Sequence, residues 1–377
     1  MVSVVVCGLS PCYDKCIKGA GPNEEEIFLK LSKRIGLIAS IAAVGLTLAA
    51  CGNNNKNAGS AKTTKYSAAL VTDGGGVDDK SFNQSGWEGL EAWGKKNGLK
   101  KGVGGYNYAQ SNSDADFTPN INKLIQAKYQ TIFGIGYKLE SAIKNAAKAN
   151  PKTNFVIIDD VIPAKNVASV TFKDNEGAFL AGVAAAKTTK TKKVGFIGGV
   201  HSAVIDRFEA GFRQGVAAVD KNISVDVKYA NDFSKPDVGQ ALANAMFNND
   251  EDVIYQAAGG TGAGVFSAAK NQIKKKKVWV IGVDQDQTAE GQYKGGNLTL
   301  TSTVKGVGTA MEKLADDAKD GKFPGGKTTV YGLKEKGVSL TKGNLSAAAW
   351  KSVQDYQKKI IDGSLKVAEK PSQLNKK

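Results

Sequence analysis

Three aspartates stand directly after strongly apolar runs, where a carboxylate could bind a ligand. They are Asp73, Asp159 and Asp284, and Phe155-Val156-Ile157-Ile158 before Asp159 is typical of the runs. A carboxylate just beyond a buried strand can accept hydrogen bonds from hydroxyl or ring N–H groups. Each aspartate alone could be a turn or cap residue. Their shared relation to a strand end instead favours one polar binding site.

The segment Thr72–Gln84 is rich in glycine and opens a predicted helix. It lacks both the dinucleotide pattern GxGxxG and the phosphate pattern GxxxxGK[ST], and its carboxylates would repel phosphate. Asp78 or Asp79 is predicted to cap the helix. Phe82 could stack on a flat ligand or belong to the core, and the sequence leaves these two readings open.

Two further side chains follow predicted strands. Phe233 is an aromatic residue after Val225–Tyr229, and Lys305 is either a charged donor to a ligand or a solvated lysine. The only histidine is His201, which argues against most metal and acid–base chemistry. We predict no catalytic residue, no metal site and no cofactor.

Cys51 follows Leu48-Ala49-Ala50, and an uncharged apolar run, 35–50, follows Lys33-Arg34. This is the pattern of an export signal, and its core is short for a transmembrane helix. We predict a signal peptide over 31–50, lipid attachment at Cys51 and a flexible tether over 51–65. A plain signal peptide or a membrane anchor is the alternative.

Residues 1–30 do not fit an export signal, because they hold an acidic run and the other three cysteines. We expect them to be a non-native extension, with translation starting near Leu31. Metal binding by Cys12 and Cys16 is disfavoured, because no second ligand pair stands at zinc-site spacing.

The chain is basic, with 51 Lys and Arg against 36 Asp and Glu and a net charge of +15. The lysines are dispersed, and the densest runs, 190–193 and 274–277, fall between predicted elements. We therefore predict no nucleic-acid partner and interpret the charge as suited to an anionic membrane or wall.

Near-continuous apolar runs alternate with amphipathic ones, as in parallel sheets buried on both faces. The predicted strands are 66–72, 131–135, 154–158, 193–197, 225–229, 252–255 and 278–283, with an extended segment at 297–304. The predicted helices are 81–97, 117–128, 140–149, 176–186, 205–219, 236–247 and 262–274.

This alternation predicts an α/β protein with two doubly wound, Rossmann-like lobes, a hinge and a cleft between the lobes. Asp160–Ala168 is predicted to be a linker. The expected bounds are 66–168 with 285–325 for the first lobe, 169–284 with 326–367 for the second, and 368–377 for a tail.

Several motifs together resemble the basic membrane protein family, whose lipoproteins are similar to type I periplasmic binding proteins and serve ABC transporters. They are DGGGVDDKSFNQSGWEGL at 73–90, FVIID at 155–159, EGAFLAGVAAA at 176–186, VGFIGG at 194–199, RFEAGFRQG at 207–215 and VIGVDQDQ at 280–287. The resemblance covers roughly 66–363.

The resemblance implies a purine-nucleoside receptor. Phe82 and Phe233 would sandwich the base, and Asp73 and Asn83 would contact its polar atoms. Asp284 and Lys305 would bind ribose hydroxyls, with Asp159 and Gly260 in the same pocket. The protein would be a monomer on the extracytoplasmic face of a Gram-positive cell membrane, held only by its lipid and partnered by permease subunits.

Three alternatives remain beside nucleoside import. The first is a lipoprotein that binds a sugar or a signalling furanose. The second is a nucleoside hydrolase with calcium at Asp284-x-Asp286, although no acidic cluster surrounds that pair. The third is a surface adhesin or antigen without a transport role.

Overall fold

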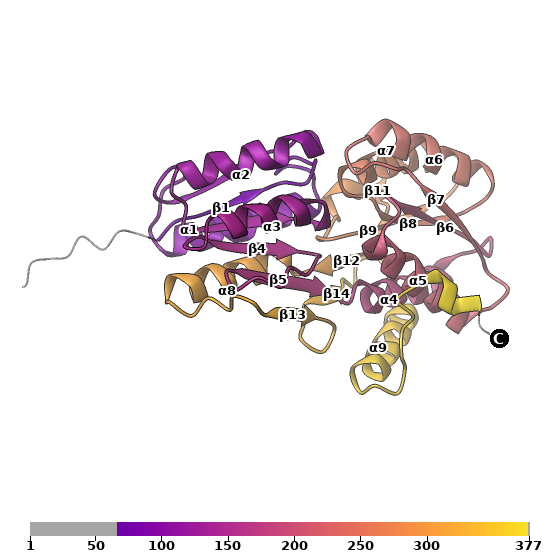
Figure 1. Cartoon of the computed structure of the whole chain (residues 1–377). Helices are drawn as coiled ribbons and strands as arrows, with labels where there is room; N and C mark the ends of the chain where they lie inside the picture. The colour runs from indigo at the N-terminus through magenta and orange to yellow at the C-terminus, as the bar shows by residue number, and fades with distance from the viewer. Residues whose placement is uncertain (1–65, 376–377) are drawn as a thin grey trace, which may run out of the picture. The chain divides into compact units, whose positions relative to one another are not determined.

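The computed structural model describes residues 66–375, which all belong to one compact unit, 61–377. Two six-stranded sheets, each flanked by helices, form two lobes (Figure 1). The predicted fold class is therefore confirmed. The predictions for residues 1–65, including lipid attachment at Cys51, lie outside the described residues. Within the described part of the chain, no helix has the length and apolar character needed to cross a membrane.

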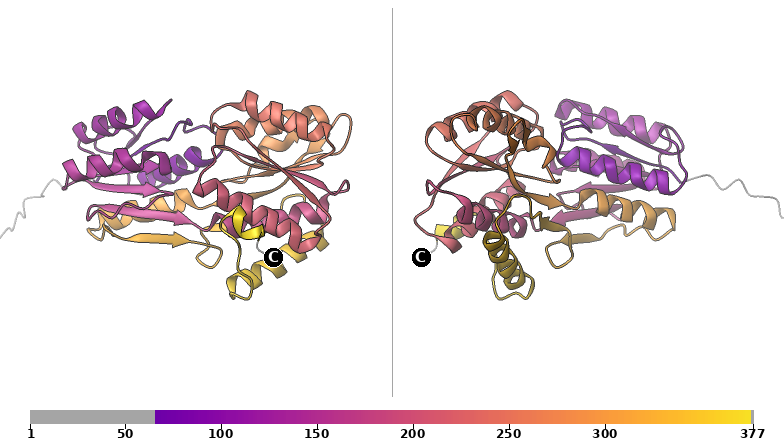
Figure 2. Two further views of the ribbon diagram at one scale, coloured as in Figure 1. Left: turned by 45° about the vertical axis from the view of Figure 1, so that its right-hand side comes forward. Right: turned by 180° about the vertical axis from the view of Figure 1, so that it is seen from behind.

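The first sheet is entirely parallel. Its strand order is β13 (Thr328–Tyr331), β5 (Val167–Phe172), β4 (Asn154–Ile158), β3 (Thr131–Ile135), β1 (Ala68–Val71) and β2 (Tyr106–Ala109). Its helices are α1 (Phe82–Lys96), α2 (Phe117–Gln126), α3 (Glu140–Ala149) and α8 (Val307–Lys319). Helices α1 and α8 lie side by side on the face opposite α2 and α3 (Figure 2).

The second sheet is parallel except for one edge strand, β14, which pairs antiparallel with β12. Its order is β14 (Val338–Leu340), β12 (Thr299–Lys305), β9 (Trp279–Gly282), β8 (Val253–Ala257), β6 (Lys193–Gly198) and β7 (Ser224–Tyr229). Its helices are α4 (Asp174–Thr188), α5 (Ala203–Val219), α6 (Pro236–Asn248), α7 (Gly262–Gln272) and α9 (Ala347–Ile361). A short hairpin, β10 (Gln292–Tyr293) with β11 (Gly296–Asn297), precedes β12.

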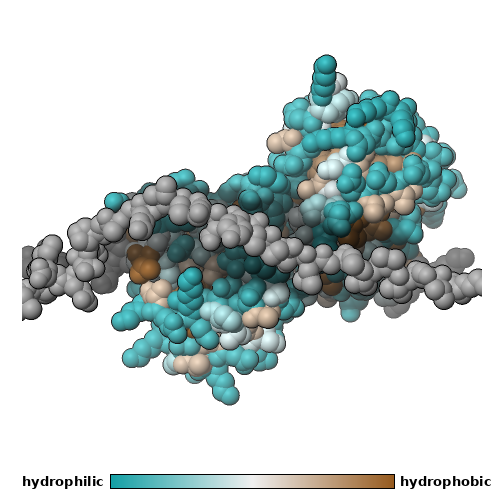
Figure 3. Space-filling view, turned by 90° about the horizontal axis from the view of Figure 1, so that it is seen from above, coloured by the Kyte–Doolittle hydropathy of each residue, from teal (hydrophilic) through white to brown (hydrophobic). Residues whose placement is uncertain are grey.

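Alternation of side chains along each strand explains why both faces of a sheet are apolar. In β1, Ala69 and Val71 pack under α2 and α3, whereas Ala68 and Leu70 pack under α1 and α8. The outer faces of the helices are polar, and the visible surface of the described chain in Figure 3 is mostly hydrophilic. Burial of the central strands on both faces fixes where their carboxyl ends lie.

The strand pairing differs from the predicted lobe bounds in three places. Strand β12, predicted to lie in the first lobe, pairs with β9 in the second sheet. Strands β5 and β13, predicted to lie largely in the second lobe, pair with each other in the first sheet. The predicted linker also ends early, because β5 begins at Val167. Serines and threonines in β5 and β12 interrupt their apolar runs, so hydrophobicity alone did not reveal how these strands pair.

Within residues 66–375 the chain crosses between the two sheets in three places. The first crossing joins β5 to α4, the second joins β12 to α8, and the third joins β13 to β14. Two of these crossings begin or end at buried charged residues, Asp174 at the start of α4 and Lys305 at the end of β12. These two crossings therefore meet where Lys305 contacts Asp174 and, in the other lobe, Asp159.

Candidate functional site

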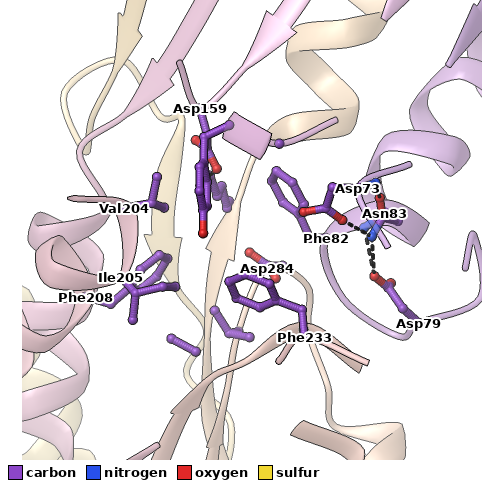
Figure 4. Close-up of a pocket in the computed structure, with 16 residues that line it drawn as sticks. Asp73, Asp79, Phe82, Asn83, Asp159, Val204, Ile205, Phe208, Phe233 and Asp284 are labelled. Carbon is purple, nitrogen blue, oxygen red and sulfur yellow. Dashed lines mark hydrogen bonds and ion pairs between the residues drawn. The ribbon is translucent and has the colours of Figure 1, made fainter. Parts of the chain in front are cut away.

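A pocket lies between the lobes, beyond the carboxyl ends of their strands, where open α/β sheets bind ligands (Figure 4). Seven of the eight predicted site residues line it, and Gly259 lines it in place of its predicted neighbour Gly260. The first lobe contributes Asp73, Asp79, Phe82, Asn83, Gly136, Tyr137 and Asp159. The second contributes Val204, Ile205, Phe208, Phe233, Ala257, Gly259, Val283, Asp284 and Lys305.

Asp79 organises the loop between β1 and α1. Its carboxylate accepts hydrogen bonds from the backbone N–H groups of Ser81, Asn83 and Gln84, at 2.8, 3.0 and 3.0 Å. These are N–H groups of the first turn, which have no partner inside the helix. The N-cap position of α1 is Ser81, and of the two predicted capping residues it is Asp79, two positions earlier, that accepts hydrogen bonds from the start of the helix.

Asn83 links two carboxylates at this end of the pocket. Its side-chain amide donates to Asp73 Oδ1 at 3.1 Å and to Asp79 Oδ2 at 3.0 Å (Figure 4). Burial raises the pKa of Asp73 to about 6, although the hydrogen bond from Asn83 opposes the rise. Gly136 lets this carboxylate approach, because a Cβ there would lie 2.7 Å from Asp73 Oδ2. The group can accept a hydrogen bond from a ligand, or donate one when it is protonated.

Asp159 and Asp284 stand at equivalent strand ends in the two lobes. Both have left-handed backbone conformations, with φ of 69° and 65°, which turn the chain sharply after β4 and β9. Asp284 Oδ2 accepts a hydrogen bond from Ser81 Oγ at 2.5 Å, a contact that joins the lobes. Burial raises the pKa of Asp284 to about 7, against the opposing charge of Lys305.

Lys305 is a buried cation, and the reading of it as a solvated lysine is wrong. Its side chain is 4% exposed, and Nζ lies 2.6 Å from Asp159 Oδ2 and 3.1 Å from Asp174 Oδ1. Burial alone would lower the pKa of Lys305, but these neighbouring carboxylates raise it above its ordinary value. Lys305 therefore carries its charge inside the pocket wall.

Aromatic side chains reach the pocket from both lobes. Phe82 enters from the start of α1, and Phe233 enters from the loop after β7 (Figure 4). Phe82 is partly buried and also packs against the core, so its two predicted roles are not exclusive. The Phe233 ring lies over Gly199, where a Cβ would come within 2.2 Å of it. Lys305 Nζ is 5.1 Å from the centre of the Phe82 ring.

Sequence reasoning missed several pocket residues. Tyr137 follows β3 and could have been found by the rule that located Asp159, because Gly134-Ile135-Gly136 ends an apolar strand. The first two turns of α5 contribute Val204, Ile205 and Phe208 to the pocket. Their helical spacing is that of ordinary core residues, so it did not mark them as site residues. Asp286, the second half of the predicted calcium pair, accepts hydrogen bonds from Thr288 N and Oγ1 at 3.0 and 2.6 Å.

The chain matches one protein family and is similar to several known proteins. A family described as "ABC transporter substrate-binding protein PnrA-like" matches residues 66–370. The "CD4+ T-cell-stimulating antigen" of Listeria innocua is 51% identical, over 89% of this chain and 98% of that protein. The "ABC transporter nucleoside-binding protein BmpA" of Lactococcus lactis is 50% identical, over 90% of this chain and 100% of that protein.

A solved structure shares the architecture. The solute-binding protein of an ABC transporter system from Aeropyrum pernix matches with a TM-score of 0.73 and 23% identity, over 81% of this chain and 94% of that one. At this identity the likeness shows the fold alone.

Proposed function

Because the chain belongs to the Bmp family of PnrA-like ABC transporter substrate-binding proteins, we propose that its interlobe pocket binds nucleosides, and purine nucleosides in particular. The name of the Lactococcus lactis relative, a nucleoside-binding protein, supports this ligand class. The argument from this chain's own residues is independent of that name.

One observation carries the proposal. Two phenylalanines from opposite lobes, Phe82 and Phe233, line the same pocket as four buried ionisable side chains, Asp73, Asp159, Asp284 and Lys305. A flat base suits such aromatic walls, because stacking on an aromatic side chain contributes about 1–3 kcal/mol per base. A sugar alone would leave most of this aromatic surface without a partner.

The polar groups divide into two sets that suit the two halves of a nucleoside. Asp73 and Asn83 lie together, and both N–H groups of the Asn83 amide are donated to Asp73 and Asp79. The pair therefore offers carboxylate and amide oxygens as acceptors for the N–H groups of a base. Asp284 and Lys305 lie at the other strand ends, beside Asp159, and offer acceptors and a donor for ribose hydroxyls. We assign Asp73 and Asn83 to the base side of the site. We assign Asp284 and Lys305 to its ribose side.

As a substrate-binding protein of an ABC transporter, the chain works with permease subunits. We infer that it delivers the nucleoside to them from the extracytoplasmic face of the membrane. We also infer that it is a monomer tethered by a lipid on Cys51. The sequence around Cys51 supports the anchor, and the position of the pocket between two lobes supports capture by closure.

A thermal-shift screen tests the ligand class. Purine nucleosides should raise the melting temperature, since a ligand at a hundredfold its Kd adds about 2.7 kcal/mol to the free energy of unfolding. Free ribose and nucleoside monophosphates should raise it much less. A screen in which only sugars stabilise the protein would contradict the proposal and favour a sugar-binding role.

A further inference from the structure

Arg207 lies near the pocket but has no place in the site described so far. It stands in the second turn of α5, and its Nε and Nη2 donate to Asp174 Oδ2 at 3.2 and 3.1 Å. The Asp174 side chain is 1% exposed and that of Arg207 is 20% exposed. Neither residue lines the pocket. Their ion pair is therefore a partly buried contact outside the pocket lining.

The second oxygen of Asp174 connects this pair to the pocket. Asp174 Oδ1 lies 3.1 Å from Lys305 Nζ, which in turn lies 2.6 Å from Asp159 Oδ2. A continuous series of ionic contacts thus runs from α5 through the start of α4 to the end of β12, and then to β4 of the other lobe. Two carboxylates hold Lys305. Asp159 lines the pocket, whereas Asp174 lies outside the pocket lining.

This buried ion set contains two acids and two bases. Asp159 and Asp174 balance Lys305 and Arg207, so their formal charges sum to zero. A further acid near Arg207, Glu369, is exposed, so solvent screens its charge. Charges in a buried or partly buried wall are screened less than charges in bulk water. A phosphate entering the pocket would therefore meet no net positive charge from this set. Asp284, which lines the pocket and also interacts with Lys305, is an acid and adds no positive charge.

We propose that Arg207 and Asp174 are specificity-determining positioning residues, which hold Lys305 in the pocket wall and keep the buried ion set neutral. The pocket thereby accepts a neutral nucleoside and rejects its phosphorylated form. Arg207 neutralises Asp174, so Asp174 orients Lys305 without adding a net negative charge. This inference rests on the proposed nucleoside function and assigns the basis of its selectivity.

Four proteins test the charge balance: wild type, Asp174→Asn, Arg207→Gln and the double variant. Asp174→Asn changes the net formal charge of the ion set from zero to +1, and Arg207→Gln changes it to −1. In the double variant the net charge is zero again. The measurement is the ratio of Kd for inosine 5′-monophosphate to Kd for inosine, from competition calorimetry. Taking the ratio cancels any damage that weakens both ligands alike.

We expect the ratio of the two Kd values to be lowest in Asp174→Asn and highest in Arg207→Gln. Wild type and the double variant should have equal ratios between these two. Asp174→Asn should lower the ratio by about tenfold or more, as expected for a buried charge next to a residue of the pocket lining. Arg207→Lys keeps the charge and should restore the wild-type ratio. A double variant with the ratio of Asp174→Asn would overturn the proposal.

Arg213→Gln is the matched control. It removes the same charge from the same helix, but Arg213 pairs with Glu209, at 2.7 Å, and does not line the pocket. Its ratio should equal that of wild type, and an equal change in Arg213→Gln and Arg207→Gln would refute a specific role for Arg207.

If Asp174→Asn does not fold, the comparison of Arg207→Gln with Arg207→Lys decides the question alone. If wild type binds no inosine, the nucleoside function itself fails; inosine binding without the expected order refutes only this inference.

Discussion

Lys305 Nζ lies 2.6 Å from Asp159 Oδ2, and this buried ion pair joins the end of a strand in one lobe to the end of a strand in the other. Both side chains are 4% exposed, and both line the pocket. The same two groups thus connect the lobes and line the pocket between them.

Lys305→Met should destabilise the protein by about 3–5 kcal/mol, because it leaves Asp159 and Asp174 as buried charges without their shared partner. Urea denaturation measures this loss. Adding Asp159→Asn should recover part of it, since one uncompensated charge is then removed. A double variant less stable than Lys305→Met would show that the pair does not carry this energy.

Phe82→Ala should weaken binding of a nucleoside by roughly 1–3 kcal/mol, through loss of a stacking face. Its cost in apo stability should fall below the 3–5 kcal/mol of a fully buried phenylalanine, because Phe82 is only partly buried. Phe133→Ala is the control, since Phe133 is 0% exposed and lies outside the pocket lining. Equal stability losses and unchanged affinity would mean that Phe82 is purely a core residue.

Asp284→Asn should weaken a nucleoside more than its free base. The substitution keeps the size of the side chain but replaces an acceptor pair with one acceptor and one donor, which suits ribose hydroxyls less well. Calorimetry with inosine and hypoxanthine compares the two losses. If both ligands lose affinity equally, Asp284 does not hold the ribose.

The pH dependence of stability should also change in Asp284→Asn. The folded protein raises the pKa of Asp284 from 3.8 to about 7, so it retains a proton that the unfolded chain releases. The stabilisation from this proton is complete below the unfolded pKa and is lost as pH rises through about 7.

Between pH 4 and 7, wild type should therefore lose stability relative to Asp284→Asn, by at most about 1.4 kcal/mol per pH unit. Urea denaturation of both proteins across this range measures the difference. A difference that does not vary with pH would show that Asp284 titrates normally.

Cys51→Ala should release the protein from membranes or block its processing, because the cysteine of Leu48-Ala49-Ala50-Cys51 is the predicted site of lipid attachment. Fractionation of cells that express the variant measures the release. Mass spectrometry of the wild-type protein supplies the control. An unmodified N-terminus at another residue would disprove the anchor.

Much of the site could be predicted from the sequence, because parallel strands buried on both faces leave a plain apolar signal. The aspartates after Ile158 and Val283 could be assigned to strand ends, and the carboxyl ends of parallel strands meet at one edge of a sheet. The motifs around them also identified the family, which the family match over 66–370 confirms.

Tertiary structure alone decided which strands pair and which charges meet. Strand β12 contains four buried serines and threonines, so hydrophobicity did not reveal its place in the second sheet. Lys305 has the local pattern of a solvated lysine, and its burial depends on Asp159 and Asp174, which are 146 and 131 positions away. Arg207 meets Asp174 only because α5 packs on α4. Such contacts depend on which elements pack together, whereas local sequence reports mainly the periodicity of single elements.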